Sequence, residues 1–173
     1  VVNFEFEDGK VTGKVEYDGQ KCPATYDDAD LSGVSGYVLP LLHQYNVIGE
    51  NDNLTAIGVR VVAPAMRFTK DELLTDEVIA ALEAIQKKAP LHITTVLAEI
   101  KQIKSHFPGV PLVAISDTAF HVTKNNCAWY YGIDPELAEK TGIKRYGYHG
   151  ISMGSIVHYL QEQNALAPKT IIC

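Results

Sequence analysis

The sequence predicts an α/β fold with a mixed sheet, flanking helices and an antiparallel β-meander at its amino-terminal end. The opening stretch alternates apolar and polar residues and is interrupted by Asp-Gly turns, a pattern typical of hairpin-linked strands. Two later segments are short, apolar and β-branched, as buried strands are. Helical patterns alternate with these two segments, which indicates helices packed on a sheet.

The meander is predicted as three consecutive strands over Val2–Glu7, Val11–Tyr17 and Lys21–Tyr26. Apolar and polar residues alternate most clearly in the first of them, which is the period of a half-buried strand. Pro23 lacks a backbone N–H, so the third strand is expected at an edge of the sheet.

An acidic turn, Asp27–Asp30, is expected to cap the next helix, Leu31–Tyr45. Two glycines and a proline within that range weaken the helical pattern. Leu54–Val62 is predicted as a buried strand. Thr69–Glu72 matches a capping box with a hydrophobic staple, and Asp76–Lys87 then has helical periodicity with acids first and lysines last.

Proline ends that helix, and Leu91–Phe107 carries an apolar stripe at helical spacing. Val110–Ser116 is predicted as the second buried strand. A short helix over Glu136–Lys140 is expected to be capped by Asp134. Ser152–Gln163 is predicted as the last helix.

Composition narrows the classes of protein. The 173 residues suit one domain with a real core, or one domain plus a small appendage. A composition of 46% hydrophobic and 21% charged residues is ordinary for a globular protein. The net charge of -6 argues against a nucleic-acid surface, and no apolar run approaches the ~20 residues of a membrane span. Cys22, Cys127 and Cys173 are widely spaced, which favours reduced thiols in the cytoplasm over a disulfide framework or zinc site.

Three polar groups are candidates for chemistry. Arg60 lies near the end of one predicted buried strand, Asp117 follows the other, and His149 lies with Arg145 in the glycine-rich, basic segment Gly142–Met153. Ligands of open α/β sheets gather beyond the carboxyl ends of strands, so neighbouring parallel strands would bring the first two groups together. The alternatives are a surface salt bridge for the arginine, a cap or turn for the aspartate, and a structural histidine.

Four motifs in order carry a resemblance to a known family. Asp117–His121 and Arg145–Ser152 closely resemble the Asp-Thr-Ala-Phe-His and Arg-Tyr-Gly-Phe-His-Gly-Thr-Ser signatures of acetate kinases. Arg60–Val62 resembles the Arg-Val-Val segment of that family, and Ala89–His92 resembles its Ala-Pro-Leu-His segment. Four such motifs with compatible spacing are a specific signal.

The resemblance implies a fold and a reaction. Acetate kinases belong to the actin-like ATPase superfamily, with two ribonuclease-H-like lobes, and residues 1–173 would form a single amino-terminal lobe. The family transfers a phosphoryl group between ATP and acetate with Mg²⁺, giving acetyl phosphate and ADP. Arg60 would bind the carboxylate or the transferring phosphoryl group. Asp117 would be the catalytic acid near Mg²⁺, and His149 would donate a hydrogen bond to the phosphoryl group.

By the same resemblance, Val62, Leu91 and Tyr148 would line the apolar pocket for the acetate methyl group. The chemistry of the substrate agrees, because a carboxylate titrates near ~4 and needs no base at neutral pH. The obstacle is repulsion between two anions, which a planar guanidinium relieves. We therefore expect Asp117 to organise a metal or the arginine rather than to accept a proton.

The sequence also departs from the family pattern. Ala63–Ala65 replaces the usual His-Gly-Gly, and the Asn-x-Gly-Ser-Ser-Ser and His-Leu-Gly-Asn-Gly phosphate segments are not found. Lys169–Cys173 resembles the start of a strand, so we expect the chain to be part of a longer protein. Residues 1–173 would then lack the first phosphate-binding strand and the nucleotide lobe of the family. The expected partners are a short-chain carboxylate and a nucleotide, in a parent homodimer. The alternatives are a kinase for propionate or butyrate, and a non-catalytic lobe kept as a binding or regulatory module.

Overall fold

The computed structural model describes residues 1–8, 10–24, 34–49 and 53–165. The chain divides into two compact units. The first comprises Val1–Thr55 and Ala98–Val110, and the second comprises Ala56–Leu97 and Pro111–Cys173. Within the described residues, no helix combines the length and the apolar character that crossing a membrane requires.

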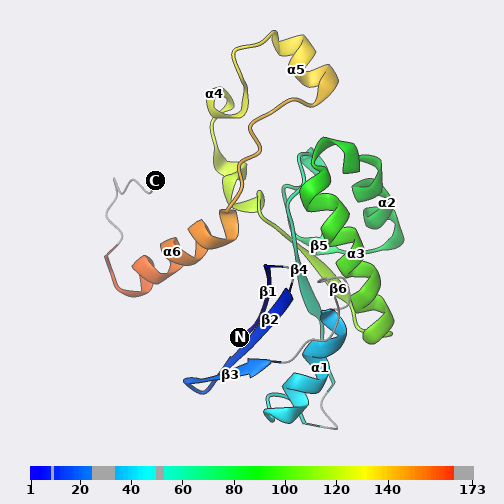
Figure 1. Ribbon diagram of the computed structural model, residues 1–173. Helices are drawn as coiled ribbons and strands as arrows, with labels where there is room; N and C mark the ends of the chain where they lie inside the picture. The colour runs from blue at the N-terminus through cyan, green and yellow to red at the C-terminus, as the bar shows by residue number, and fades with distance from the viewer. Residues whose placement is uncertain (9, 25–33, 50–52, 166–173) are drawn as a thin grey trace. The chain divides into compact units, whose positions relative to one another are not determined.

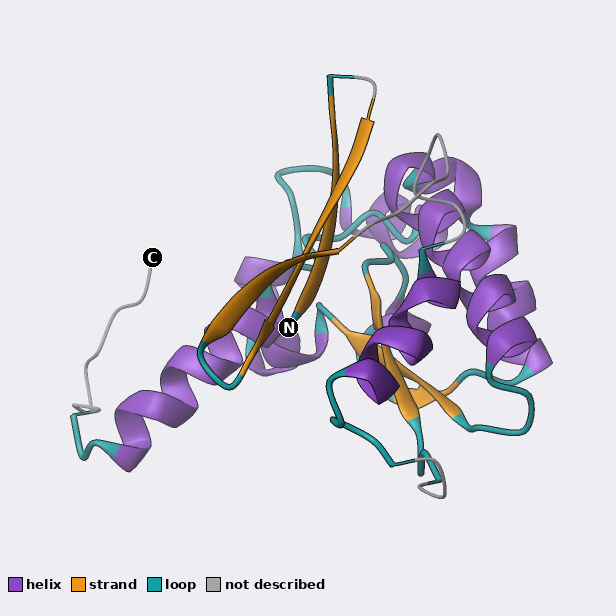
Figure 2. Cartoon of the chain, turned by 60° about the horizontal axis from the view of Figure 1, so that its bottom comes forward, coloured by secondary structure: helices purple, strands orange, loops and turns teal. Residues whose placement is uncertain are grey.

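The first unit contains the predicted meander. Strands β1 (Val2–Glu7), β2 (Lys10–Tyr17) and β3 (Gln20–Ala24) pair antiparallel in the order β1-β2-β3. Figure 2 shows them as one long twisted ribbon. Pro23 lies in β3, an edge strand, as predicted from its missing N–H. Helix α1 (Ser35–Gln44) follows, inside the range expected from the sequence.

The second unit contains a mixed sheet. Strands β4 (Ile57–Val61) and β6 (Leu112–Ser116) pair in parallel, with Val61 opposite Ser116, and β5 (Glu72–Leu73) pairs antiparallel with the other side of β6. The order β4-β6-β5 places β6 in the centre, and Figure 1 shows the strands together. The prediction of α/β structure with a mixed sheet is confirmed.

Two helices carry buried apolar side chains at positions that the sequence predicts. Helix α2 (Asp76–Ala84) begins at an N-cap threonine, and α3 (Pro90–His106) begins at the predicted proline break. Proline is well suited to a first helical position because its missing N–H has no partner there. The buried members of the two predicted apolar stripes are Val78, Leu82, Ile93, Val96 and Ile100.

The predicted capping box is wrong. The hydroxyl of Thr69 donates to the backbone oxygen of Met66 at 2.8 Å, and Glu72 belongs to β5 instead of a first helical turn. The helix starts later, where Thr75 Oγ1 accepts a hydrogen bond from the backbone N–H of Val78 at 3.4 Å. Backbone pairing with β6 prevails here over a local sequence pattern, since a capping box contributes only about 1 kcal/mol.

The remaining helices follow β6. The described 3₁₀ helices are η1 (Met66–Phe68), η2 (Gln86–Lys88) and η3 (Ala119–Thr123), and the later α-helices are α4 (Asn126–Trp129), α5 (Pro135–Thr141) and α6 (Gly150–Glu162). Asp134 caps α5 as predicted, because its Oδ1 accepts from the N–H of Leu137 at 2.9 Å. Helix α6 starts two residues before the predicted position.

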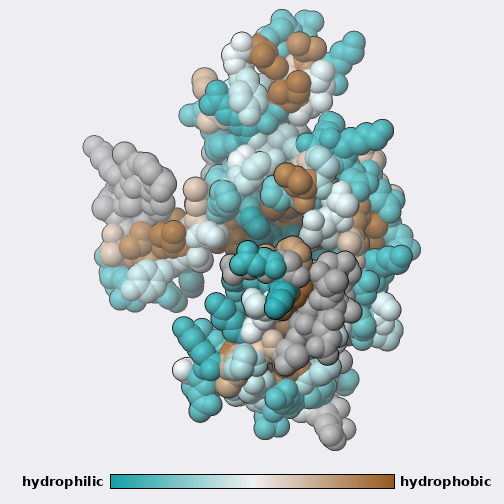
Figure 3. Space-filling model, in the orientation of Figure 1, coloured by the Kyte–Doolittle hydropathy of each residue, from teal (hydrophilic) through white to brown (hydrophobic). Residues whose placement is uncertain are grey.

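Helix α6 keeps an apolar edge in contact with solvent. Ile151, Ile156 and Tyr159 are 40%, 46% and 60% exposed, and Figure 3 shows hydrophobic side chains along one edge of this helix.

Two predictions lie outside the described residues: the acidic turn Asp27–Asp30 and the strand beginning at Lys169–Cys173. The predicted end of the third strand at Tyr26 lies outside them as well.

Candidate functional site

The parallel pairing of β4 and β6 brings two of the predicted groups together. Arg60 is the penultimate residue of β4, and Asp117 directly follows β6, where its N–H continues the ladder to the oxygen of Val61 at 3.0 Å. Arg60 Nη2 donates to Asp117 Oδ2 at 2.7 Å. The two side chains, separated by 57 positions in the sequence, therefore meet at the carboxyl edge of the sheet, the usual place for ligands in such folds.

Asp117 is almost completely buried, with 1% of its surface exposed. Its Oδ2 also accepts from the backbone N–H of His149 at 2.7 Å, and its Oδ1 accepts from the N–H of Ile151 at 3.4 Å. Burial alone would raise the pKa of this carboxyl. The hydrogen bonds from Arg60 and from the two backbone N–H groups outweigh burial and hold the pKa below its ordinary value of 3.8. Asp117 is thus an ionised acceptor at neutral pH.

The glycine-rich segment is attached to the residues after β6 by further hydrogen bonds. Gly150 N–H donates to the backbone oxygen of Asp117 at 2.9 Å. Thr118 Oγ1 donates to the oxygen of Gly147 at 2.9 Å, and His121 Nε2 lies 2.9 Å from the oxygen of Tyr148. Since a carbonyl only accepts, His121 must carry its proton on Nε2. The Asp-Thr-Ala-Phe-His motif therefore holds the second motif in place.

Two positions of this segment have unusual backbone geometry. Gly147 has a φ of 79°, and a Cβ at that position would lie 2.7 Å from Cδ2 of His121, so both conformation and space require glycine. His149 also has a positive φ, 59°, which is uncommon for a residue with a side chain. Its N–H is held by Asp117, and its exposed imidazole makes no hydrogen bond to the described part of the chain.

Ser116 shapes the turn that carries Asp117. Its hydroxyl donates to the backbone oxygen of Phe68 at 2.5 Å and accepts from the N–H groups of Thr118 and Ala119, both at 3.1 Å. The sequence alone predicts Ser116 as the end of a strand, and His121 enters only as the last residue of a motif. Their position inside and directly before the Asp-Thr-Ala-Phe-His motif was the available signal for a supporting role.

The three residues predicted to line the pocket for the acid are placed differently. Val62 is buried, with 7% of its surface exposed, whereas Leu91 is 86% exposed. Tyr148 is partly buried and lines a cavity of about 780 Å³. Neither Val62 nor Leu91 is among the residues that line this cavity. The structure thus brings Arg60, Asp117 and the backbone of His149 together. It does not gather Val62, Leu91 and Tyr148 around this cavity.

A cage of several protein ligands for a metal ion is not found among the described residues. They contain no group of three or more His, Cys, Asp or Glu side chains arranged to hold a metal ion. Mg²⁺ prefers carboxylate and water oxygens, and the carboxylate at this site, Asp117, already accepts from Arg60 and two backbone N–H groups.

Comparison with known proteins relates this geometry to a family. The model of the Acetokinase family matches residues 1–172. Among curated proteins, the acetate kinase of Shouchella clausii (strain KSM-K16) is 35% identical over 148 residues, which are 86% of this chain and 38% of that protein. The acetate kinase of Coprothermobacter proteolyticus (strain ATCC 35245 / DSM 5265 / OCM 4 / BT) is 40% identical over 145 residues, 83% of this chain and 35% of that protein.

Solved structures of an acetate kinase and a propionate kinase also resemble this chain. Porphyromonas gingivalis acetate kinase matches with a TM-score of 0.74 and 28% identity, over 91% of this chain and 40% of that one. A propionate kinase from Francisella tularensis subsp. tularensis SCHU S4 matches with a TM-score of 0.76 and 26% identity, over 90% of this chain and 40% of that one. The chain therefore spans well under half the length of each of these relatives.

Proposed function

Since the chain belongs to the acetokinase family, we propose that it is the acid-binding part of a phosphotransferase that acts on short carboxylic acids. In the reaction, a carboxylate oxygen of acetate bonds to the terminal phosphorus of ATP, and the bond from that phosphorus to the bridging oxygen of ADP breaks. The products are acetyl phosphate and ADP. The ribonuclease-H-like, actin-like ATPase lobe over residues 1–173 is part of this proposal and is supported by the mixed sheet.

The observation that carries the proposal is the contact between Arg60 and Asp117. The carboxylate holds one guanidinium nitrogen at 2.7 Å, while the arginine side chain stays 55% exposed. The other N–H groups of Arg60 have no partner in the described residues, so they are free for the oxygens of an incoming carboxylate or phosphoryl group. A fixed cation at this edge lowers the repulsion between two anions as they approach.

Asp117 acts in this proposal by positioning. Its carboxylate orients Arg60 and accepts from the backbone N–H of His149. The proposed role of the exposed imidazole of His149 is to donate to a phosphoryl oxygen. The substrate carboxylate is already ionised, so neither group has to remove a proton from it. No step of the proposed transfer depends on a magnesium ligand from the described residues.

The identity of the acid is open to a second candidate. The match to a propionate kinase structure at 26% identity supports a substrate with one more methylene than acetate. A single methylene changes selectivity by only about 1–3 kcal/mol, so a modest change in pocket shape suffices to exchange the two acids.

The experiment is an acyl-phosphate assay, with hydroxylamine trapping, on the protein encoded by the complete reading frame. Acetate and propionate are compared as acceptors with Mg-ATP as donor. We expect acid-dependent product, and Arg60→Ala is expected to lower kcat by about 10²–10³-fold, as loss of one transition-state charge contact does. Arg67→Ala is the matched control, because Arg67 pairs with Glu72 and Glu77 instead of Asp117.

The outcomes are distinct. The 173-residue chain assayed alone is expected to form no acyl phosphate. Absence of any acid-dependent product from the complete protein would favour the binding or regulatory lobe. Equal activity of the Arg60→Ala and Arg67→Ala variants would reject the proposed role of Arg60.

A further inference from the structure

Lys124 is a charged side chain beside the candidate site that has no part in the proposed chemistry. It follows η3 directly and lies seven positions after Asp117 in the sequence. Its Nζ donates to the backbone oxygen of Arg145, and to that of Tyr146 at 3.2 Å. The ammonium also lies over the ring of Trp129, 4.3 Å from its centroid. Lys124 therefore contacts backbone oxygens and an aromatic face in the described part of the chain.

These contacts belong to the amino-terminal half of the glycine-rich segment. The N–H of Arg145 donates to the oxygen of Trp129 at 2.7 Å, and the ring of Trp129 meets that of Tyr146 edge-on, with centroids 6.1 Å apart. Tyr146 is buried, and its hydroxyl donates to the oxygen of Gly142 at 2.8 Å. Lys124 thus ties the residues after η3 to a stretch of backbone that is already folded around an aromatic pair.

The positive charge of Lys124 is held at a cost. Burial, with the guanidinium of Arg145 nearby, lowers the pKa of Lys124. Hydrogen bonds to two carbonyls and the contact with the ring of Trp129 offset part of that cost. A neutral side chain of similar length would avoid the cost altogether, so packing alone does not account for a lysine at this position.

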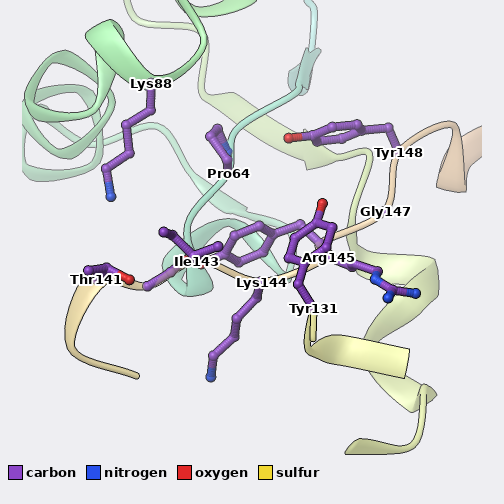
Figure 4. A pocket seen from close by; sticks show the side chains of 11 residues that line it. Pro64, Lys88, Tyr131, Thr141, Ile143, Lys144, Arg145, Gly147 and Tyr148 are labelled. Atoms are coloured by element: carbon purple, nitrogen blue, oxygen red, sulfur yellow. The ribbon is translucent and has the colours of Figure 1, made fainter. Parts of the chain in front are cut away.

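The other half of the segment carries groups of the candidate site. Tyr148 lines the cavity, and His149 donates its backbone N–H to the aspartate of the site. Figure 4 shows the segment from Lys144 to Tyr148 along one side of this cavity. Gly147 lies between the two halves, with a positive φ that favours glycine. Because Tyr146 is only three residues before His149, a displaced Tyr146 carbonyl would move the backbone that carries the imidazole.

We propose that Lys124 is a positioning residue for the phosphoryl transfer. Its ammonium holds the carbonyls of Arg145 and Tyr146, and it thereby fixes the backbone from which the imidazole of His149 donates to the phosphoryl group. Lys124 itself touches neither substrate, so its effect passes through His149. The inference rests on the proposed function and deepens it by naming a residue that sets the geometry of the site.

The first test compares Lys124→Met, Lys124→Arg and Lys140→Met in the acyl-phosphate assay of the complete protein. Methionine keeps an aliphatic chain but removes the charge and the donors. We expect it to lower kcat by at least about tenfold with a smaller change in KM, because a misplaced transition-state donor affects turnover more than binding. Arginine should restore most of the turnover, since a guanidinium also donates to carbonyls and stacks on aromatic rings. Lys140 is exposed in α5, and its variant is the control expected to keep kcat unchanged.

A double-mutant cycle separates positioning from general support of the fold. His149→Asn removes the imidazole at a position with a φ of 59°, which asparagine tolerates. If Lys124 acts through His149, Lys124→Met should lower kcat by less than about twofold in the His149→Asn background. An equal loss in both backgrounds would overturn the proposal, because Lys124 would then act independently of His149.

Amide exchange distinguishes failure of this inference from failure of the proposed function. Peptides from residues 142–150 of the complete protein should exchange faster in Lys124→Met, and Lys124→Arg should restore their protection. Lys124→Gln, which is neutral but polar, gives the same comparison should the methionine variant unfold. Unchanged exchange, or full turnover of the neutral variant in an active protein, overturns the inference. Absence of acid-dependent product from the unaltered protein rejects the proposed function, and exchange alone then decides whether Lys124 holds the segment.

Discussion

The close contact between the start of α6 and the turn after β6 predicts a specific cost for one added methyl group. A Cβ at Gly150 would lie 2.9 Å from Cβ of Phe120 and closer still to the backbone oxygen of Asp117, where ordinary contact begins at 3.4 Å. The carbonyl cannot rotate away without losing the hydrogen bond from Gly150 N–H at 2.9 Å. Gly150→Ala must therefore push α6 away from the turn.

The size of the effect follows from two opposing contributions. Overpacking in a rigid contact costs about 1–3 kcal/mol, and the strained hydrogen bond adds about 1 kcal/mol. Alanine gains at most about 1 kcal/mol in helix propensity, and less at a first helical position. We expect a net loss of about 2 kcal/mol for Gly150→Ala.

Gly154 provides a matched control on the same helix. A Cβ there would lie 3.6 Å from Cδ2 of Phe120, which is ordinary contact. Gly154→Ala is therefore expected to raise the free energy of unfolding by about 0.5–1 kcal/mol, through helix propensity alone.

The assay is urea unfolding followed by the fluorescence of Trp129, the single tryptophan, which belongs to the same unit. For a slope of about 2 kcal/mol/M, the midpoint should fall by about 1 M in Gly150→Ala and rise slightly in Gly154→Ala. Equal midpoints for the two variants would refute the close contact between α6 and the turn, and with it the geometry assigned to His149.

Three further predictions concern the same unit. Folding lowers the pKa of Asp117, so the contribution of its carboxylate to stability is full above pH 3.8 and is lost as the pH falls below that value. Asp117→Asn should therefore flatten this part of the acid-unfolding curve, measured by fluorescence. Asp134→Ala should destabilise α5 by about 1 kcal/mol in urea unfolding, since its cap is lost, and an unchanged midpoint would contradict the cap. His121→Phe should speed amide exchange of His149, whereas His121→Gln, which keeps a donor for Tyr148, should restore protection; equal exchange rates in both would exclude the hydrogen bond.

The main elements followed from the sequence because they depend on local pattern, and the convergence of two strand ends was expected on the condition that the strands pair in parallel. Buried apolar segments at Leu54–Val62 and Val110–Ser116 predict central strands, and polar residues directly after such strands predict a site at their carboxyl edge. The structure places Arg60 and Asp117 at that edge. The structure supplies the condition, because β4 and β6 pair in parallel and therefore end on the same side of the sheet.

Other features depend on contacts that no local pattern contains. Glu72–Leu73 is too short for a recognisable strand period, and only its pairing with β6 makes it one. The hydrogen bonds from Thr118 and His121 to the glycine-rich segment join residues about 30 positions apart. Side-chain exposure is equally non-local, and Leu91 and Val62 accordingly differ in burial although both were predicted to line one pocket.

The most direct test of the proposed site is a double-mutant cycle in the acyl-phosphate assay of the complete protein. If Asp117 acts by holding Arg60, then Arg60→Gln, Asp117→Asn and the double variant should reduce kcat/KM for the acid by similar factors, because the second substitution removes a contact already lost. Multiplied effects in the double variant, as for independent groups, would contradict the account.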